Sequence, residues 1–411
     1  MISIVTRLLQ SVIVFLPMQY VFAQQDFQEY YDQVYQIRVI SSQAGSKSSI
    51  GSGFQVTLDG LIVTNYHVVS SFVLSPETFQ IEYQSHTGEK GSLQLLDFDV
   101  VNDLAVLRHS NPQARVLNFA RQDLNKGEIV YALGNPHDYG TTLVNGANNG
   151  MVEHSYNDKI LYSGSLNSGM SGGPALNENG EVVGVNVATA GSQLSFLVPA
   201  KKAMTLVDAK REIAQADYLL EIAKQIKSWQ RPRVQELIDQ EWGQETFAGL
   251  NLFGEIRKDF QCWGRTNDDN EARHVEHTSK SCRSGDSIYL DPELSAGELY
   301  FSFEHSKTLD LNATQFVARY QSIMRPRNKS NFEHSTNFQC HTDFVDNKNA
   351  QSFVRVTTCI RAYKKIRELY DSLFLVEQVR NDEKVISHFS VSAVEKDQIQ
   401  AVNQKFFEEL L

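Results

Sequence analysis

The stretch SGMSGGPALNENGEVVGV, residues 168–185, places Ser171 among glycines, just ahead of a short apolar run. A turn uses glycine because glycine enters positive φ without steric cost, and a serine adds little to such a turn. A serine nucleophile instead needs a base, a group that orients this base, and backbone N–H donors for an oxyanion. The stretch therefore directs attention to histidines and carboxylates elsewhere in the chain.

Short strands surround this stretch. Between residues 35 and 199, runs such as YQIRVI, GLIVTNYHVV and EIVYALG are separated by glycine and asparagine. Many short strands with intervening turns predict an all-β barrel or sandwich. Helical spacing begins only afterward, in residues 201–231, where apolar side chains recur every three or four positions. We predict one connecting helix there, which ends before Pro232.

His67 and Asp103, both earlier in the sequence, are candidate partners for Ser171. His67 ends the predicted strand GLIVTNYHVV, and imidazole is the side chain whose ordinary pKa lies nearest neutrality. Asp103 directly precedes the apolar run of VNDLAVLRH, and Asp97 and Asp99 are its rivals. Each residue alone is a weak signal, because lone histidines and carboxylates at strand starts are common.

Taken in order, TNYHVV, NDLAVLR and GMSGGP resemble the chymotrypsin-like (trypsin-like) serine proteases, and most closely the bacterial HtrA (Deg) branch. GSGF at residues 51–54 and ALGNP at residues 132–136 are similar to further elements of that branch. The resemblance covers about residues 35–200. It implies an all-β double six-stranded barrel, with the active site in the cleft between the barrels.

The same resemblance implies a role for each matching residue. Ser171 would attack the peptide carbonyl, His67 would take and return its proton, and Asp103 would orient and stabilise the imidazole. The N–H groups of Gly169 and Ser171 would form the oxyanion hole. Met170 stands where the HtrA branch usually has asparagine, which leaves the resting conformation of this loop open. The implied substrate pocket is lined by Ser165, Leu166, Asn167, Asn186 and Ala188. Ser165 offers no negative charge, which favours small or medium uncharged side chains.

The net charge of the chain limits the classes of partner that we expect. The formal net charge is −11, and residues 24–200 carry 8 basic and 17 acidic residues. Nucleic-acid binding needs clustered Lys and Arg, so we expect no nucleic-acid partner. We expect a polypeptide substrate, and the proposed mechanism needs no metal and no organic cofactor.

The N-terminus has the pattern of an export signal. Arg7 precedes an apolar run, and Val21-Phe22-Ala23 leads to a cleavage site with small residues. We predict a signal peptide over residues 1–23 and a periplasmic or secreted bacterial protein without a stable membrane span after cleavage. The alternative is an uncleaved anchor, although Gln10, Pro17 and Gln19 interrupt the run.

All four cysteines lie in the last third of the chain, at Cys262, Cys282, Cys340 and Cys359. In an exported chain an even set indicates two disulfide bonds, with a zinc site as the less favoured alternative because no C-x-x-C pair is present. DFQC at residues 259–262 is echoed by NFQC at residues 337–340, which indicates an internal duplication or a chance similarity. A duplication favours pairing within each unit, one of three connectivities.

The predicted organisation has four parts after the signal peptide: a protease domain over 24–200, a connecting helical segment over 201–245, and two α+β units over 246–328 and 329–411. The two units match no family that we recognise, and they either bind a protein or peptide ligand or only stabilise the chain. The chain is predicted to be a serine endopeptidase that cleaves extended or misfolded polypeptides. The alternative is a binding or sensing protein with a latent or inactive protease-like domain.

Overall fold

The computed structural model describes residues 27–136, 139–191, 194–269, 273–321, 333–347, 352–379 and 382–410. The predicted signal peptide, residues 1–23, lies outside these residues. Within these ranges, no helix combines the length and the apolar character that a membrane crossing requires.

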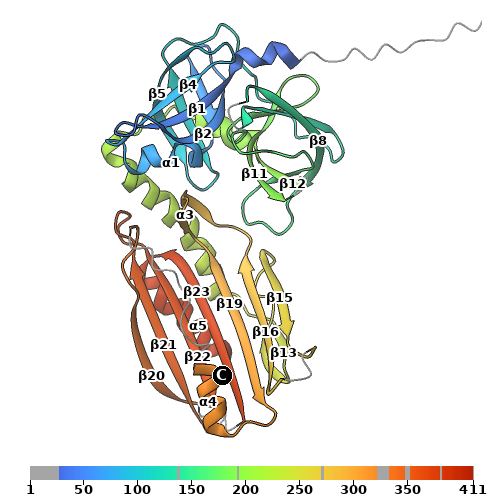
Figure 1. Ribbon diagram of the computed structural model, residues 1–411, viewed down its shortest axis with the longest axis vertical. Coiled ribbons are helices and arrows are strands. Elements are labelled where there is room, and N and C mark those ends of the chain that lie inside the picture. Colours follow the sequence, from blue (N-terminus) through green and yellow to red (C-terminus); the bar gives the residue numbers. More distant parts are fainter. Residues whose placement is uncertain are drawn as a thin grey trace, which may run out of the picture.

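The first half of the chain forms two closed six-stranded barrels, which confirms the predicted double-barrel fold (Figure 1). The strand orders are β1-β2-β3-β6-β5-β4 and β10-β11-β12-β9-β8-β7, and neighbouring strands are antiparallel. The first barrel and its helices comprise η1 (Phe27–Gln33), β1 (Val34–Ser41), β2 (Lys47–Gln55), β3 (Leu61–Thr64), α1 (Tyr66–Leu74), β4 (Phe79–Gln84), β5 (Lys90–Asp99) and β6 (Leu104–His109). The second comprises β7 (Ile129–Gly134), β8 (Thr142–Met151), β9 (Ile160–Tyr162), β10 (Pro174–Leu176), β11 (Val182–Gly191) and β12 (Leu194–Pro199).

The predicted strand around His67 is wrong in its second half. Strand β3 ends at Thr64, Asn65 has an extended backbone, and helix α1 begins at Tyr66. Val68 and Val69 favour strands by propensity, but both are buried in the core of the first barrel. Tertiary packing therefore overrides local propensity here.

The predicted single connecting helix is also wrong. Two helices occupy this region, α2 (Ala200–Asp208) and α3 (Tyr218–Asp239), with the short 3-10 turn η3 (Gln215–Asp217) before the second. Helix α3 continues through Pro232, which removes one hydrogen bond of the helix. Val234 and Leu237, beyond the proline, are fully buried in the core of the C-terminal region, and this packing extends the helix past it.

The C-terminal region is built on one seven-stranded sheet of order β15-β16-β19-β23-β22-β21-β20. The two predicted units share this sheet, since β19 of the first pairs with β23 of the second. Helices α3 and α5 pack against it (Figure 1). The elements are β13 (Gln244–Phe247), β14 (Leu250–Phe253), β15 (Phe260–Thr266), β16 (Val275–Ser284), β17 (Ile288–Asp291), β18 (Leu294–Ala296), β19 (Leu299–Thr308), α4 (Ala313–Gln321), β20 (Gln339–Asn347), β21 (Ser352–Ala362), β22 (Tyr370–Val379), β23 (Glu383–Val394) and α5 (Lys396–Leu410).

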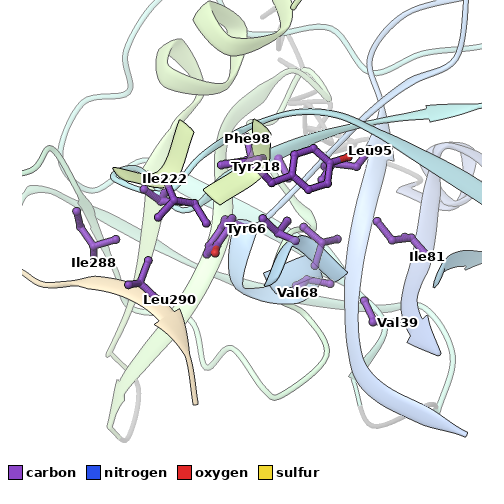
Figure 2. Packing of buried hydrophobic residues seen from close by; sticks show 14 of the residues in the cluster. Val39, Tyr66, Val68, Ile81, Leu95, Phe98, Tyr218, Ile222, Ile288 and Leu290 are labelled. Atoms are coloured by element: carbon purple, nitrogen blue, oxygen red, sulfur yellow. The ribbon is translucent and has the colours of Figure 1, made fainter. Parts of the chain in front are cut away.

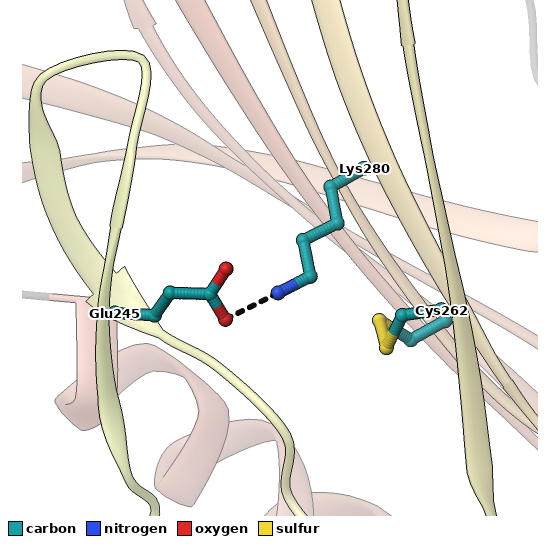
Figure 3. Close-up of a disulfide and its surroundings, with 4 residues drawn as sticks. Glu245, Cys262 and Lys280 are labelled. Atoms are coloured by element: carbon teal, nitrogen blue, oxygen red, sulfur yellow. Dashed lines mark hydrogen bonds and ion pairs between the residues drawn. A yellow bond between two sulfur atoms is a disulfide. The ribbon is translucent and has the colours of Figure 1, made fainter.

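Two disulfide bonds join neighbouring strands of this sheet, as predicted. Cys262 pairs with Cys282 and Cys340 with Cys359, and in each pair the two residues lie directly opposite in the strand register. Figure 3 shows the first bond beside an ion pair between Glu245 on β13 and Lys280 on β16. All four thiols are oxidised, so none is available as a zinc ligand.

One apolar cluster joins the two halves of the molecule. It contains residues of the first barrel and of α1, the first turns of α3, and Ile288 and Leu290 of the C-terminal strand β17. In Figure 2, Tyr66 of α1, Ile222 of α3 and the two β17 residues occupy the same region. Burial of apolar surface drives such association, so the C-terminal region and the first barrel are packed on one another.

Candidate active site

His67 is the second residue of helix α1, at the end of the first barrel. Its Nδ1 lies 2.6 Å from Oδ2 of Asp103, and its backbone N–H donates to Oδ1 of the same carboxylate at 2.8 Å. The first N–H groups of a helix have no partner within the helix, so this carboxylate also caps α1. With Nδ1–H directed at Asp103, Nε2 is the nitrogen that can act as a base.

Burial and Asp103 have opposite effects on the pKa of His67. Burial by itself lowers the pKa of His67, because a charged imidazolium loses hydration. The negative charge of Asp103 and its hydrogen bond both raise it, and together they outweigh burial. The pKa of His67 is therefore raised above its ordinary value.

The backbone of Asp103 is held in an uncommon conformation. Its φ is +55°, in the left-handed region that aspartate and asparagine tolerate better than most residues. The side-chain amide of Asn65 donates to the carbonyl oxygen of Asp103 at 2.7 Å. Asn65 of the TNYHVV motif thus fixes the residue that orients His67, a role that the sequence did not reveal.

The two rival carboxylates have other partners. Asp99 Oδ1 accepts from the backbone N–H groups of Val101 and Asn102, both at 2.9 Å. Asp97 is buried, and its Oδ2 lies 3.6 Å from Nε of Arg211. Of the three candidates, Asp103 is the one that the fold brings to His67.

The Ser171 loop lies against the junction of β3 and α1. A Cβ atom built on Gly172 would come within 2.2 Å of the carbonyl oxygen of Ser52 and 2.9 Å of the backbone nitrogen of Asn65. Gly172 also has a φ of +84°. Only glycine permits this approach, which brings the Ser171 loop of the second barrel beside the strand end that leads to His67.

Ser52 of the GSGF motif makes two hydrogen bonds to this loop and one to the ALGNP motif. Its Oγ donates to the carbonyl oxygen of Gly169 at 2.7 Å and accepts from the backbone N–H of Asn135 at 2.9 Å. Its backbone N–H donates to the carbonyl oxygen of Ser171 at 2.7 Å. The GSGF, ALGNP and GMSGGP motifs therefore interlock at Ser52. The sequence contained all three motifs but gave no sign of this contact, which spans 117 residues.

The predicted oxyanion loop is a tight turn. The N–H of Met170 donates to the carbonyl oxygen of Asn167 at 3.0 Å, and Gly169 has a φ of +95°. Met170 is fully buried, and a Cβ on Gly134 would lie 2.7 Å from its Cα. Gly134 of the ALGNP motif thus leaves room for Met170, so methionine at this position serves as a core residue beneath the turn.

The Ser171 hydroxyl is not directed at His67. Its Oγ donates to the carbonyl oxygen of Val187 at 2.6 Å. Val187 lies at a register shift between β11 and β12, where Asn186 and Ala188 pair but Val187 does not. Transfer of the hydroxyl proton to His67 requires that Oγ first leave this carbonyl.

The predicted pocket residues fall into several environments. Ser165 and Asn167 are exposed, and Leu166 is buried in the core of the second barrel. Asn186 is a correction: it is fully buried, and its amide donates to the carbonyl oxygens of Leu133 at 2.9 Å and Met170 at 3.4 Å. Its side chain supports the loop from below and does not line a pocket. The side chain of Ala188 lies outside the part of the chain that the structure describes.

Part of this chain is similar to known proteins. The family model for the trypsin-like peptidase domain matches residues 51–185. Human serine protease HTRA3 is 31% identical over 193 residues, which cover 44% of this chain and 40% of that protein. A probable periplasmic serine endoprotease, DegP-like, from Chlamydia pneumoniae is 30% identical over 192 residues, covering 44% and 38%. The crystal structure of the serine endoprotease from Yersinia pestis aligns with a TM-score of 0.39 at 24% identity, covering 44% and 63%.

The similarity to these proteins covers part of the chain. The chain spans about two fifths of the length of the curated relatives that it matches. The residues that the family model matches contain His67, Asp103 and Ser171 together with the loops that hold them. Residues 51–185 therefore form a trypsin-like peptidase domain, and the chain is similar to HtrA and DegP-like serine proteases.

Proposed function

We propose that this protein is an exported serine endopeptidase that hydrolyses extended or misfolded polypeptides. The main supporting observation is that Asp103 contacts both the ring and the backbone N–H of His67. The loop that carries Ser171, between glycines, lies close by on the second barrel. A carboxylate that holds both the ring and the backbone of one histidine leaves Nε2 poised to accept a proton.

In the proposed reaction, Ser171 Oγ rotates from Val187 toward His67 Nε2 and attacks the peptide carbonyl carbon. His67 takes the hydroxyl proton as the Oγ–C bond forms, and the N–H groups of Gly169 and Ser171 stabilise the oxyanion. His67 then donates that proton to the leaving amine as the C–N bond breaks. Water, activated by the same base, releases the acyl group and restores Ser171.

Two further observations support export. Both disulfide bonds need an oxidising environment to form and persist. The DegP-like relative is named as a periplasmic endoprotease, and the same location is proposed for this protein.

A second candidate function has one observation in its favour. The hydrogen bond from Ser171 Oγ to Val187 occupies the nucleophile. A protein that senses a ligand through its C-terminal region, with a protease-like domain latent until that ligand binds, would rest in such a state.

The test is cleavage of a reduced, alkylated polypeptide by the full chain, with the native fold of the same polypeptide as a second substrate. We expect cleavage of the unfolded form alone, and its loss in Ser171→Ala. The exposed Ser110 gives the matched control, Ser110→Ala, which should cleave like the parent. Equal cleavage by Ser171→Ala and the parent would contradict the proposal, and absence of cleavage by any form would favour the latent domain.

A further inference from the structure

The C-terminal region reaches the catalytic histidine through one short hairpin. Strands β17 and β18 pair from Ile288 opposite Ala296 to Asp291 opposite Leu294. The side chains of Ile288 and Leu290 are buried in the cluster shared with the first barrel, and Leu290 is fully enclosed (Figure 2). Tyr289, between them, is half-buried and packs against the same cluster.

Tyr289 contacts His67. The centroids of the two rings are 5.8 Å apart and the ring planes meet at 73°, an edge-to-face arrangement that is favourable for aromatic pairs. The imidazole is thus held on one side by Asp103 of its own barrel and on another by a residue more than 200 positions away in the sequence.

A second anchor holds the segment that leads into the hairpin against the other barrel. Asp286 is buried, and its carboxylate accepts from the Lys159 ammonium at 2.5 Å, from Ser155 Oγ at 2.9 Å, and from the backbone N–H of Tyr156. Burial raises the pKa of Asp286, but Lys159 and these donors outweigh it, and the net pKa is lowered. The carboxylate is therefore charged, and it binds the loop between β8 and β9.

The far end of the hairpin is fixed within the C-terminal region. Asp291 lies 2.9 Å from Nε2 of His334. Tyr363 and Leu369, from the loop between β21 and β22, belong to the same apolar cluster as Ile288. The segment from Asp286 to Asp291 thus contacts the first barrel, the second barrel and the C-terminal region within six residues.

We propose that this hairpin completes the active site and that Tyr289 is a positioning residue for His67. The inference rests on the proposed function, because it assigns Tyr289 a part in the same proton transfer. The ring of Tyr289 limits rotation of the imidazole through this edge-to-face contact. His67 is correctly placed to take the proton of Ser171 only while the C-terminal region is packed against both barrels.

Tyr289→Ala, Tyr289→Leu and Tyr289→Phe in the full chain test this role. Misplacement of a catalytic group by about 1 Å costs on the order of 100-fold in rate, so we expect Tyr289→Ala to lower kcat by about 10- to 100-fold with little change in KM. Tyr289→Leu also removes the ring contact and should lower kcat in the same direction. Tyr289→Phe keeps the ring contact and should match the parent. Tyr300 of β19, outside the shared cluster, gives the control Tyr300→Ala, which should match the parent.

A second readout does not depend on proteolysis. In histidine-labelled protein, the Nδ1 proton of His67 that faces Asp103 gives a downfield resonance, and Tyr289→Ala should broaden it by faster exchange with water. The acid limb of the kcat/KM profile should also move, because Tyr289 helps to exclude water from His67; Tyr66, Asp103 and Asp291 are the other titratable groups nearby.

The outcomes separate the two proposals. Loss of kcat together with a broadened resonance supports the positioning role. Kinetics and resonance unchanged from Tyr300→Ala would overturn it, and so would a gain in kcat, which would make the hairpin inhibitory. If the parent protein cleaves nothing through Ser171, the proposed function fails, and the resonance alone still decides whether Tyr289 holds His67. If Tyr289→Ala does not fold, Tyr289→Leu, which keeps an apolar side chain but removes the ring, decides through the same two readouts, with Tyr289→Phe as its control.

Discussion

His67 is held by two regions of the molecule that differ in how they are encoded. Asp103 belongs to the same barrel, stands 36 residues away in the sequence, and lies in a short motif that identifies it. Tyr289 belongs to the C-terminal region and lies in a hairpin that has no recognisable motif. The first contact lies within one barrel and its helix, whereas the second forms because the C-terminal region packs against that barrel. Each prediction below removes a contact either within the two barrels or between the barrels and the C-terminal region.

Asp103→Asn should have the largest effect. Asparagine tolerates the left-handed backbone of this position, so the fold should persist while the orienting charge is lost. We expect kcat to fall about 10⁴-fold, the order known for loss of this carboxylate in a catalytic triad. Steady-state kinetics beside the exposed control Asp59→Asn would measure it. A loss of less than about tenfold would show that Asp103 does not orient the base.

The pH dependence of kcat/KM tests the same contact between Asp103 and His67. His67 acts as a base when neutral, so kcat/KM should fall as pH drops through its pKa. Asp103 raises that pKa, which places the acid limb of the parent above about 6.5, the ordinary value for histidine. In Asp103→Asn both raising causes are weakened, and the acid limb of the residual activity should move to lower pH. A limb that stays in place would contradict the assigned pairing.

Gly172→Ala should break the contact between the Ser171 loop and the first barrel. The new Cβ would meet the carbonyl oxygen of Ser52 at 2.2 Å, at a φ of +84°. Backbone strain and overpacking together should lower the free energy of unfolding by about 3 kcal/mol or more. Gly127→Ala is the matched control, because Gly127 has a φ of +94° with open space around it. Urea unfolding that shows equal losses for both would rule out the close approach.

Asp286→Asn should have a smaller effect on stability. It tests the contact between the C-terminal region and the second barrel. It removes the charge that binds Lys159 and weakens the contacts to the loop of the second barrel. We expect a loss of about 2 kcal/mol in the free energy of unfolding. Asp310, which pairs with His274 on the surface, gives the control Asp310→Asn with a loss below about 1 kcal/mol. Equal unfolding midpoints for the two variants would show that Asp286 does not anchor the region.

The sequence predicted the parts of the site that short motifs carry. His67, Asp103 and Ser171 could be predicted because each sits in a recognisable local setting. The cysteine pairing could be predicted because FQC recurs at Cys262 and Cys340 and each is followed by a second cysteine after a similar interval. Ser52 and Asn65 lie in the same motifs, yet their roles depend on contacts across the fold. The passage of α3 through Pro232 depends on apolar packing beyond the proline, which local propensity opposes. The contact of Tyr289 with His67 arises from tertiary packing alone, so no local pattern could indicate it.

Labelling of Ser171 by a fluorophosphonate probe, followed by intact mass, tests the central claim most directly. Such probes react with a serine only when base and oxyanion hole act on it together. The account predicts one adduct per chain in the parent, none in Ser171→Ala, and slower labelling in Tyr289→Ala than in Tyr300→Ala. A folded parent protein that forms no adduct, or an adduct that persists in Ser171→Ala, would contradict it.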